Sequence, residues 1–143
     1  MYIHRNTRAM QIKVIDKLAW IEIKDKLILS TKSYGKDKYY IPGGKRENGE
    51  TDEQALYREI KEELSIEIKK DTIKLVGVFQ AQAHGHPTGT NVKMTCYTAD
   101  FTGQLKADSE IEEINWLNYS DKDKISEVDK LIFDFLYEKG LLD

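Results

Sequence analysis

The chain has a single cysteine, Cys96, and only two prolines among its 143 residues. One cysteine excludes an internal disulfide framework and is compatible with a reducing cytoplasm. Hydrophobic runs are short, as in Leu131-Ile132-Phe133, and none reaches the roughly 20 apolar residues that a membrane-spanning helix needs. The first residues carry positive charge without a following apolar stretch, which argues against a secretory signal. We therefore expect a cytoplasmic protein without a membrane partner.

A large excess of charge of one sign is also missing. The chain has 25 acidic and 22 basic residues, and its formal net charge is −3. Without a basic stripe to neutralise phosphates, we expect no nucleic-acid duplex as a partner. A small phosphorylated molecule stays compatible, because a bound divalent cation reverses the local charge. The length predicts one domain over residues 1–143, as a monomer or a homodimer, with Met1–Met10 as a candidate contact arm.

Patterns of apolar residues predict an alternation of strands and helices. The expected strands are 12–32 (a hairpin with its turn near 24–26), 39–41, 73–83, 91–101 and 114–117. A helix is expected over 51–64, because Thr51 and Gln54 have the spacing of a capping box. A second, amphipathic helix is expected over 128–137. Strands on both sides of one helix, with another helix at the end, predict an α/β fold whose sheet is covered on two faces.

Three glutamates on the first predicted helix, Glu59, Glu62 and Glu63, stand at positions i, i+3 and i+4. At about 100° per residue they share one stripe, which is separate from the apolar stripe that can anchor the helix. Like charges at these spacings cost an isolated helix a few tenths of a kcal/mol per pair. A hard cation reverses that repulsion, since Mg²⁺ prefers carboxylate oxygen. The plainer alternative is a solvated acidic face, and the sequence around the helix decides between the two.

The residues before the helix complete a longer pattern. Gly44 is followed by five residues and Glu50, then by seven residues and Arg58-Glu59-Ile60-Lys61-Glu62-Glu63-Leu64-Ser65-Ile66. Residues 44–66 thus resemble the Nudix box, G-x5-E-x7-R-E-U-x-E-E-x-G-U, where U is a bulky aliphatic residue. Every charged position matches. Ser65 departs, because it replaces a glycine just past the helix end, where a left-handed backbone costs serine on the order of 1 kcal/mol.

The surrounding chain, from Trp20 to Leu117, is similar to MutT-type bacterial members of the Nudix family. This resemblance implies an α/β/α sandwich with a mixed central sheet. It also implies hydrolysis of a nucleoside diphosphate linked to another group, with Mg²⁺ as cofactor and Mn²⁺ as an alternative. The implied partner is therefore a small nucleotide.

The resemblance also implies roles for particular residues. Glu59, Glu62 and Glu63 would hold the divalent ions, with Glu50 and a backbone carbonyl of Gly43 or Gly44 as further ligands. Arg58 is expected to pair with a box carboxylate such as Glu50 or Glu62. The carboxylate that orients or deprotonates the attacking water stays open among four glutamates, and two of them are equally interpretable as surface charges: Glu62, Glu63, Glu110 and Glu113.

Substrate contacts are expected from a loop and from side chains near the box. The expected substrate-binding residues are Lys45, His84, His86 and Tyr97. A zinc site formed by the two histidines and Cys96 is disfavoured, because structural zinc sites normally use four ligands.

Three functions follow from these features. The leading one is a pyrophosphohydrolase of nucleoside triphosphates, which releases pyrophosphate and a monophosphate. The second is a pyrophosphatase of ADP-ribose or a nucleotide sugar. The third is a nucleotide-binding sensor without catalysis, which the complete set of box glutamates disfavours.

Overall fold

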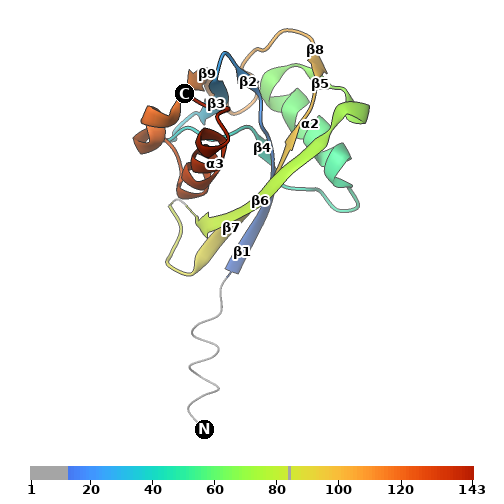
Figure 1. Ribbon diagram of the computed structural model, residues 1–143. Coiled ribbons are helices and arrows are strands. Elements are labelled where there is room, and N and C mark those ends of the chain that lie inside the picture. Colours follow the sequence, from blue (N-terminus) through green and yellow to red (C-terminus); the bar gives the residue numbers. More distant parts are fainter. Residues whose placement is uncertain (1–12, 84) are drawn as a thin grey trace.

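The computed structural model describes residues 13–83 and 85–143. Its central sheet has the strand order β4-β1-β7-β6 (Figure 1). In that order the strands are β4 (Gly43–Gly44), β1 (Lys13–Trp20), β7 (Thr90–Thr98) and β6 (Lys74–Gln82). β1 runs parallel to β7, whereas β1–β4 and β6–β7 are antiparallel. The sheet is therefore mixed, as predicted.

Two smaller sheets accompany the central one. The first contains β2 (Ile23–Lys24), β3 (Leu27–Ser33) and β9 (Ile111–Leu117), and the second pairs β5 (Glu67–Ile68) with β8 (Phe101–Thr102). Two 3₁₀ segments serve as connections along the chain. η1 (Lys70–Thr72) precedes the strand β6, and η2 (Tyr119–Lys124) joins β9 to the C-terminal helix. The predicted hairpin near the start of the chain is confirmed, with its turn between β2 and β3.

Alternation along β1 divides the core between two helices. Leu18 and Trp20 pack with α2 (Asp52–Leu64), whereas Ala19 and Ile21 pack in the cluster that contains α3 (Glu127–Glu138). Successive residues of a strand point to opposite faces, so α2 and α3 cover opposite faces of the sheet. Figure 1 shows the two helices on either side of the diagonal strands. The expected α/β/α sandwich is confirmed.

Both ends of α2 follow from its sequence. The Thr51 side chain accepts a hydrogen bond from the Gln54 amide, and the Gln54 side chain accepts one from the Thr51 amide. This is the predicted capping box, which satisfies two backbone donors at the helix start. At the other end, Ser65 adopts the expected left-handed conformation, with φ 60° and ψ 27°. Its hydroxyl donates to Asp108 over 3.3 Å.

The prediction of a strand over 39–41 is wrong. Tyr39 and Tyr40 form only isolated bridges, to Ile125 and Thr31, and the Ile41 amide donates to the Asp129 carboxylate at 2.9 Å. Three separate partners prevent a continuous ladder, and the paired strand begins only at Gly43. The predicted strand 91–101 is also divided, because pairing with β6 ends at Thr98.

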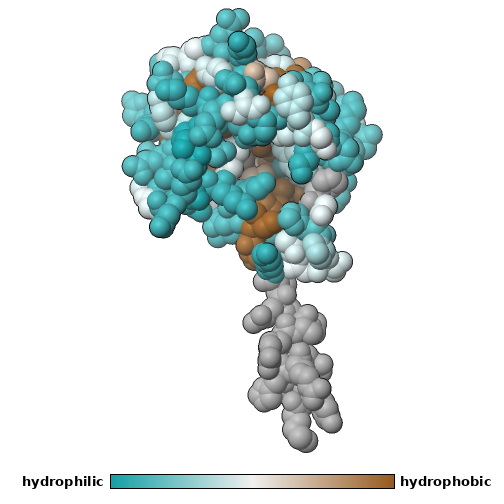
Figure 2. All heavy atoms as spheres, turned by 180° about the vertical axis from the view of Figure 1, so that it is seen from behind, coloured by the Kyte–Doolittle hydropathy of each residue, from teal (hydrophilic) through white to brown (hydrophobic). Residues whose placement is uncertain are grey.

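The face of the molecule that Figure 2 shows is mostly hydrophilic, with hydrophobic atoms exposed near the start of the described chain. Val14 of β1 is one of the large hydrophobic residues that are exposed. Among the residues that the structure describes, no helix has both the length and the apolar character to cross a membrane. The segment Met1–Met10, the candidate contact arm, lies outside the described residues.

Candidate active site

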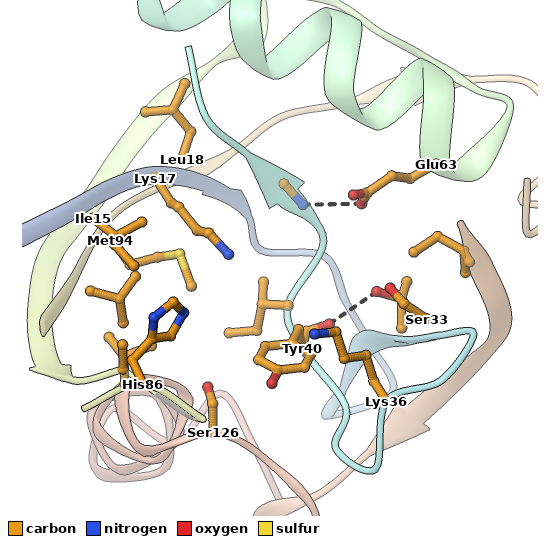
Figure 3. Close-up of a pocket in the computed structure, with 17 residues that line it drawn as sticks. Ile15, Lys17, Leu18, Ser33, Lys36, Tyr40, Glu63, His86, Met94 and Ser126 are labelled. Carbon is orange, nitrogen blue, oxygen red and sulfur yellow. Dashed lines mark hydrogen bonds between the residues drawn. The ribbon is translucent and has the colours of Figure 1, made fainter. Parts of the chain in front are cut away.

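Two glutamates of α2 lie against the backbone of β4. Glu63 is only 7% exposed, and its carboxylate accepts a hydrogen bond from the Gly43 amide at 3.2 Å (Figure 3). The Glu59 carboxylate lies so close to Gly44 that any Cβ there would overlap it. Gly43 has φ +153°, and a Cβ on it would clash with the Leu18 carbonyl oxygen of β1. The two glycines thus let the acidic helix approach the strand.

Arg58 organises the carboxylates at the start of the site. Its Nε and Nη2 donate to the two oxygens of Glu50 at 2.8 and 2.9 Å, and its Nη1 donates to Glu59 at 2.6 Å. Such bidentate, charge-assisted contacts fix the geometry of both partners. They also hold the pKa of Glu50 at about 2, with the Glu47 amide contributing. The predicted pairing of Arg58 with Glu50 is confirmed, and a longer contact reaches Glu62 at 3.5 Å.

Negative charge accumulates around Glu63. Burial raises the pKa of Glu63 to about 8, and the neighbouring carboxylates of Glu59 and Glu110 raise it further toward that value. Burial is also the largest cause of a raised pKa at Glu59, where Arg58 opposes it and Glu62 and Glu110 add to it. Glu110 therefore belongs to this acidic cluster, although it lies far from α2 in the sequence.

The donor chemistry of this acidic cluster suits a divalent cation. Carboxylate and backbone carbonyl oxygens are the ligands of Mg²⁺, and a cation would relieve the repulsion that raises the pKa of Glu63. Within residues 13–83 and 85–143, however, no three His, Cys, Asp or Glu side chains are arranged to hold a metal ion. The Glu62 side chain is 53% exposed and faces Arg58. The residues therefore fit the ion in the chemistry of their donor atoms.

A cavity of about 220 Å³ opens next to Glu63 (Figure 3). Apolar side chains from β1, β6, β7 and the start of α3 form much of its wall: Ile15, Ala83, Val92, Met94 and Val128. Its polar lining includes Lys17, Ser126 and His86. The acidic cluster and the cavity thus share Glu63 as a common boundary.

The family model for the NUDIX domain matches residues 19–135, most of the chain. The chain belongs to the Nudix family. The uncharacterized Nudix hydrolase YvcI of Bacillus subtilis (strain 168) is 29% identical over 125 residues, which cover 85% of this chain and 78% of YvcI. The solution structure of the E. coli ORF135 protein is 26% identical, with a TM-score of 0.69, and the match covers 90% of this chain and 92% of that one. The MutT protein of Methanosarcina mazei Go1 shares the fold at a TM-score of 0.72 and 16% identity, over 90% and 96% of the two chains.

Nudix hydrolases act on pyrophosphate bonds of nucleoside diphosphate-linked substrates, and they generally use divalent metals. The chain is therefore a hydrolase of such bonds, with a small nucleotide as its class of substrate. The alternative of a nucleotide-binding sensor without catalysis stays disfavoured by the complete set of box glutamates.

Two residues that the Nudix resemblance suggested lie elsewhere. Glu113 of β9 accepts a hydrogen bond from the Tyr39 hydroxyl, and no hydrogen bond in the described part of the chain joins it to the acidic cluster. Tyr97 of β7 points to the α2 face, opposite the cavity, and donates to Asp52 at 2.5 Å. Burial and that contact raise the pKa of Tyr97 to about 12. Successive residues of a strand point to opposite faces of the sheet, and this alternation decides where the side chains of Glu113 and Tyr97 lie.

The other predicted substrate residues divide into three cases. His86 lines the cavity, as the loop position suggested. The Lys45 side chain is exposed beside the site, while its carbonyl oxygen accepts from Arg58 at 3.1 Å. His84 lies outside the described residues.

Sequence reasoning missed several polar residues of the cavity wall, among them Lys17 and Ser126. The available signal was a lysine on the inward face of β1, between Ile15 and Ala19, where an apolar residue is usual. Behind this wall Asp129 is fully buried. Burial raises the pKa of Asp129 to about 7, although the Ile41 amide, the charge of Lys17 and the Ser126 hydroxyl oppose the rise.

Proposed function

We propose that this Nudix hydrolase is a Mg²⁺-dependent pyrophosphohydrolase that converts a nucleoside triphosphate into a monophosphate and pyrophosphate. The observation that supports it is the shared boundary at Glu63, where the acidic cluster meets a cavity lined by both apolar and polar side chains. Phosphates would bind at the carboxylates through the cation, while the nucleoside enters the cavity. One molecule of substrate thereby spans both parts of the site.

The box residues would hold the cation. We assign this role to Glu59, Glu62 and Glu63, with Glu50 and the Gly44 carbonyl as further ligands and Mn²⁺ as an alternative ion. A bound divalent cation polarises a phosphoryl oxygen and lowers the pKa of a bound water. The Arg58 guanidinium keeps Glu50 and Glu59 in place by hydrogen bonds to both.

The attacking water needs a carboxylate that orients it or takes its proton. Glu63 already binds the Gly43 amide, and Glu113 binds Tyr39. We retain Glu62, whose side chain is 53% exposed, and Glu110, which belongs to the acidic cluster, as the candidates. Glu110 lies close enough to Glu63 to raise its pKa.

The size of the cavity favours a substrate with one nucleoside. At about 220 Å³ it is smaller than the roughly 300–1,000 Å³ of sites for drug-sized ligands. A single base with part of its sugar matches that space better than the two halves of ADP-ribose or a nucleotide sugar. We therefore place nucleotide sugars second.

A product-release assay tests the proposal. We would measure phosphate and pyrophosphate release with Mg²⁺, with Mn²⁺ and with chelator, over nucleoside triphosphates, ADP-ribose and dinucleoside polyphosphates. Glu62→Gln and Glu63→Gln should each lower turnover by orders of magnitude without loss of thermal stability. Glu53→Gln, an exposed position on the same helix, is the matched control and should keep wild-type turnover. Wild-type rates in both box variants, or equal rates in chelator, would refute the assignment.

A further inference from the structure

Two lysines that the roles above do not use line the cavity, Lys36 and Lys17. Lys17 lies in the middle of β1, and its side chain enters the cavity from the face shared with Ile15 (Figure 3). Its ammonium makes no hydrogen bond or ion pair with any residue that the structure describes. An ammonium has three donors and no acceptor, and leaving those donors unpaired in a half-buried position costs free energy. The Lys17 ammonium can therefore donate hydrogen bonds to an acceptor on a ligand.

The charges around Lys17 indicate what kind of acceptor fits. Burial lowers the pKa of Lys17, and the nearby Lys45 lowers it further, while Asp129, Glu63 and Glu59 oppose both. An anion bound between Lys17 and Lys45 would reduce the electrostatic repulsion between these two lysines. The carboxylates themselves are taken up by the cation in the proposed function. An additional anionic group on the substrate is therefore the complementary partner.

The path of the substrate places such a group next to Lys17. Glu63 and Lys17 both line the cavity, and the walls beyond them include an apolar part formed by Ile15, Val92 and Met94. A nucleotide whose phosphates lie at the acidic cluster and whose base lies among the apolar side chains must cross this boundary with its innermost phosphate. Phosphate oxygens are strong acceptors for a lysine ammonium.

We propose that Lys17 is a substrate-binding residue that donates a hydrogen bond to an oxygen of the phosphate adjoining the nucleoside. This inference rests on the proposed function, since it uses the same orientation of the nucleotide. It predicts a contribution to affinity that depends on the phosphate and is the same for every base. A reader of the base would instead discriminate among bases, and a purely structural partner of Asp129 would affect folding alone.

Binding of nucleoside monophosphates in chelator tests this role without turnover. Calorimetry would give the dissociation constants of the four common monophosphates for the wild-type chain and for Lys17→Met. We expect the substitution to weaken each of them by about tenfold to a hundredfold, the usual range for a charge-assisted hydrogen bond. Lys17→Arg keeps a donor and should recover a large part of the affinity. Lys24→Met, on the exposed hairpin strand β2, removes the same charge outside the cavity and should change nothing.

Each other outcome overturns the inference. Unchanged affinity in Lys17→Met, with or without a loss of thermal stability, would make Lys17 a structural neighbour of Asp129. A loss confined to one base would make it a base reader, and the absence of monophosphate binding to the wild-type chain would remove the site. Glu62→Gln separates the two proposals, because it abolishes turnover but should bind monophosphates in chelator like the wild-type chain. Lack of Mg²⁺-dependent release thus contradicts the function, whereas unaltered affinity contradicts the role of Lys17.

Discussion

The buried carboxyl group of Asp129 should make the stability of the fold depend on pH. Its Oδ2 accepts the Ile41 amide at 2.9 Å, while its Oδ1 has no hydrogen bond among the described residues. Burial raises its pKa from 3.8 to about 7, against the opposing effects of that amide, of Lys17 and of Ser126. Asparagine has the same shape and a carbonyl oxygen for the Ile41 amide, but it does not ionise. The substitution Asp129→Asn therefore isolates the cost of the buried charge.

The sign follows from proton binding. Between pH 3.8 and about 7 the folded protein keeps a proton on Asp129 that the unfolded chain has released, so the free energy of unfolding falls as the pH rises. Each pH unit in that window is worth about 1.4 kcal/mol, and the loss ends above the folded pKa. From about pH 5 to about pH 8 the wild-type chain should lose about 3 kcal/mol relative to Asp129→Asn.

Urea denaturation over this pH range would measure the difference. The control is Asp134→Asn on the same helix, where Lys122 and Tyr119 hold the pKa of the carboxyl below its usual value. Because Asp134 titrates below the window, its variant should differ from the wild-type chain by a constant amount from about pH 5 to about pH 8. Parallel profiles for Asp129→Asn and the wild-type chain would show that Asp129 is not the buried, proton-holding group described above.

Two further substitutions test the backbone at either end of the acidic helix. Gly43→Ala should lower the free energy of unfolding by about 1–3 kcal/mol more than Gly49→Ala, as measured in urea. Both glycines have positive φ, but only the Cβ at 43 meets the backbone of β1, so equal losses would contradict the clash. Ser65→Gly should raise stability by about 1 kcal/mol, less the value of its hydrogen bond to Asp108. A lower midpoint in urea would show that this hydrogen bond outweighs the left-handed strain.

Local features of the site could be predicted because they depend on nearby residues. The capping box at Thr51, the left-handed Ser65 and the pairing of Arg58 with Glu50 all lie within residues 50–65. Their geometry follows from the helical repeat and from the chemistry of neighbouring side chains. The glycines before the helix are part of the same short segment.

The cavity could not be predicted in this way. Lys17 reaches it only because β1 pairs in parallel with β7 and because α3 docks on that face. Tyr97 was assigned to the substrate although its strand parity points it at α2, and this parity is fixed by long-range pairing. Asp129 lies beside other charged residues in the first turn of α3, which suggests an exposed position. In the structure it is fully buried and accepts a hydrogen bond from the Ile41 amide.

The alternation of β1 separates two tasks between adjacent residues. Leu18 packs in the same hydrophobic cluster as α2, and the Lys17 side chain enters the cavity. Substitutions at positions 15 and 17 should therefore change the cavity wall more directly than the packing of α2.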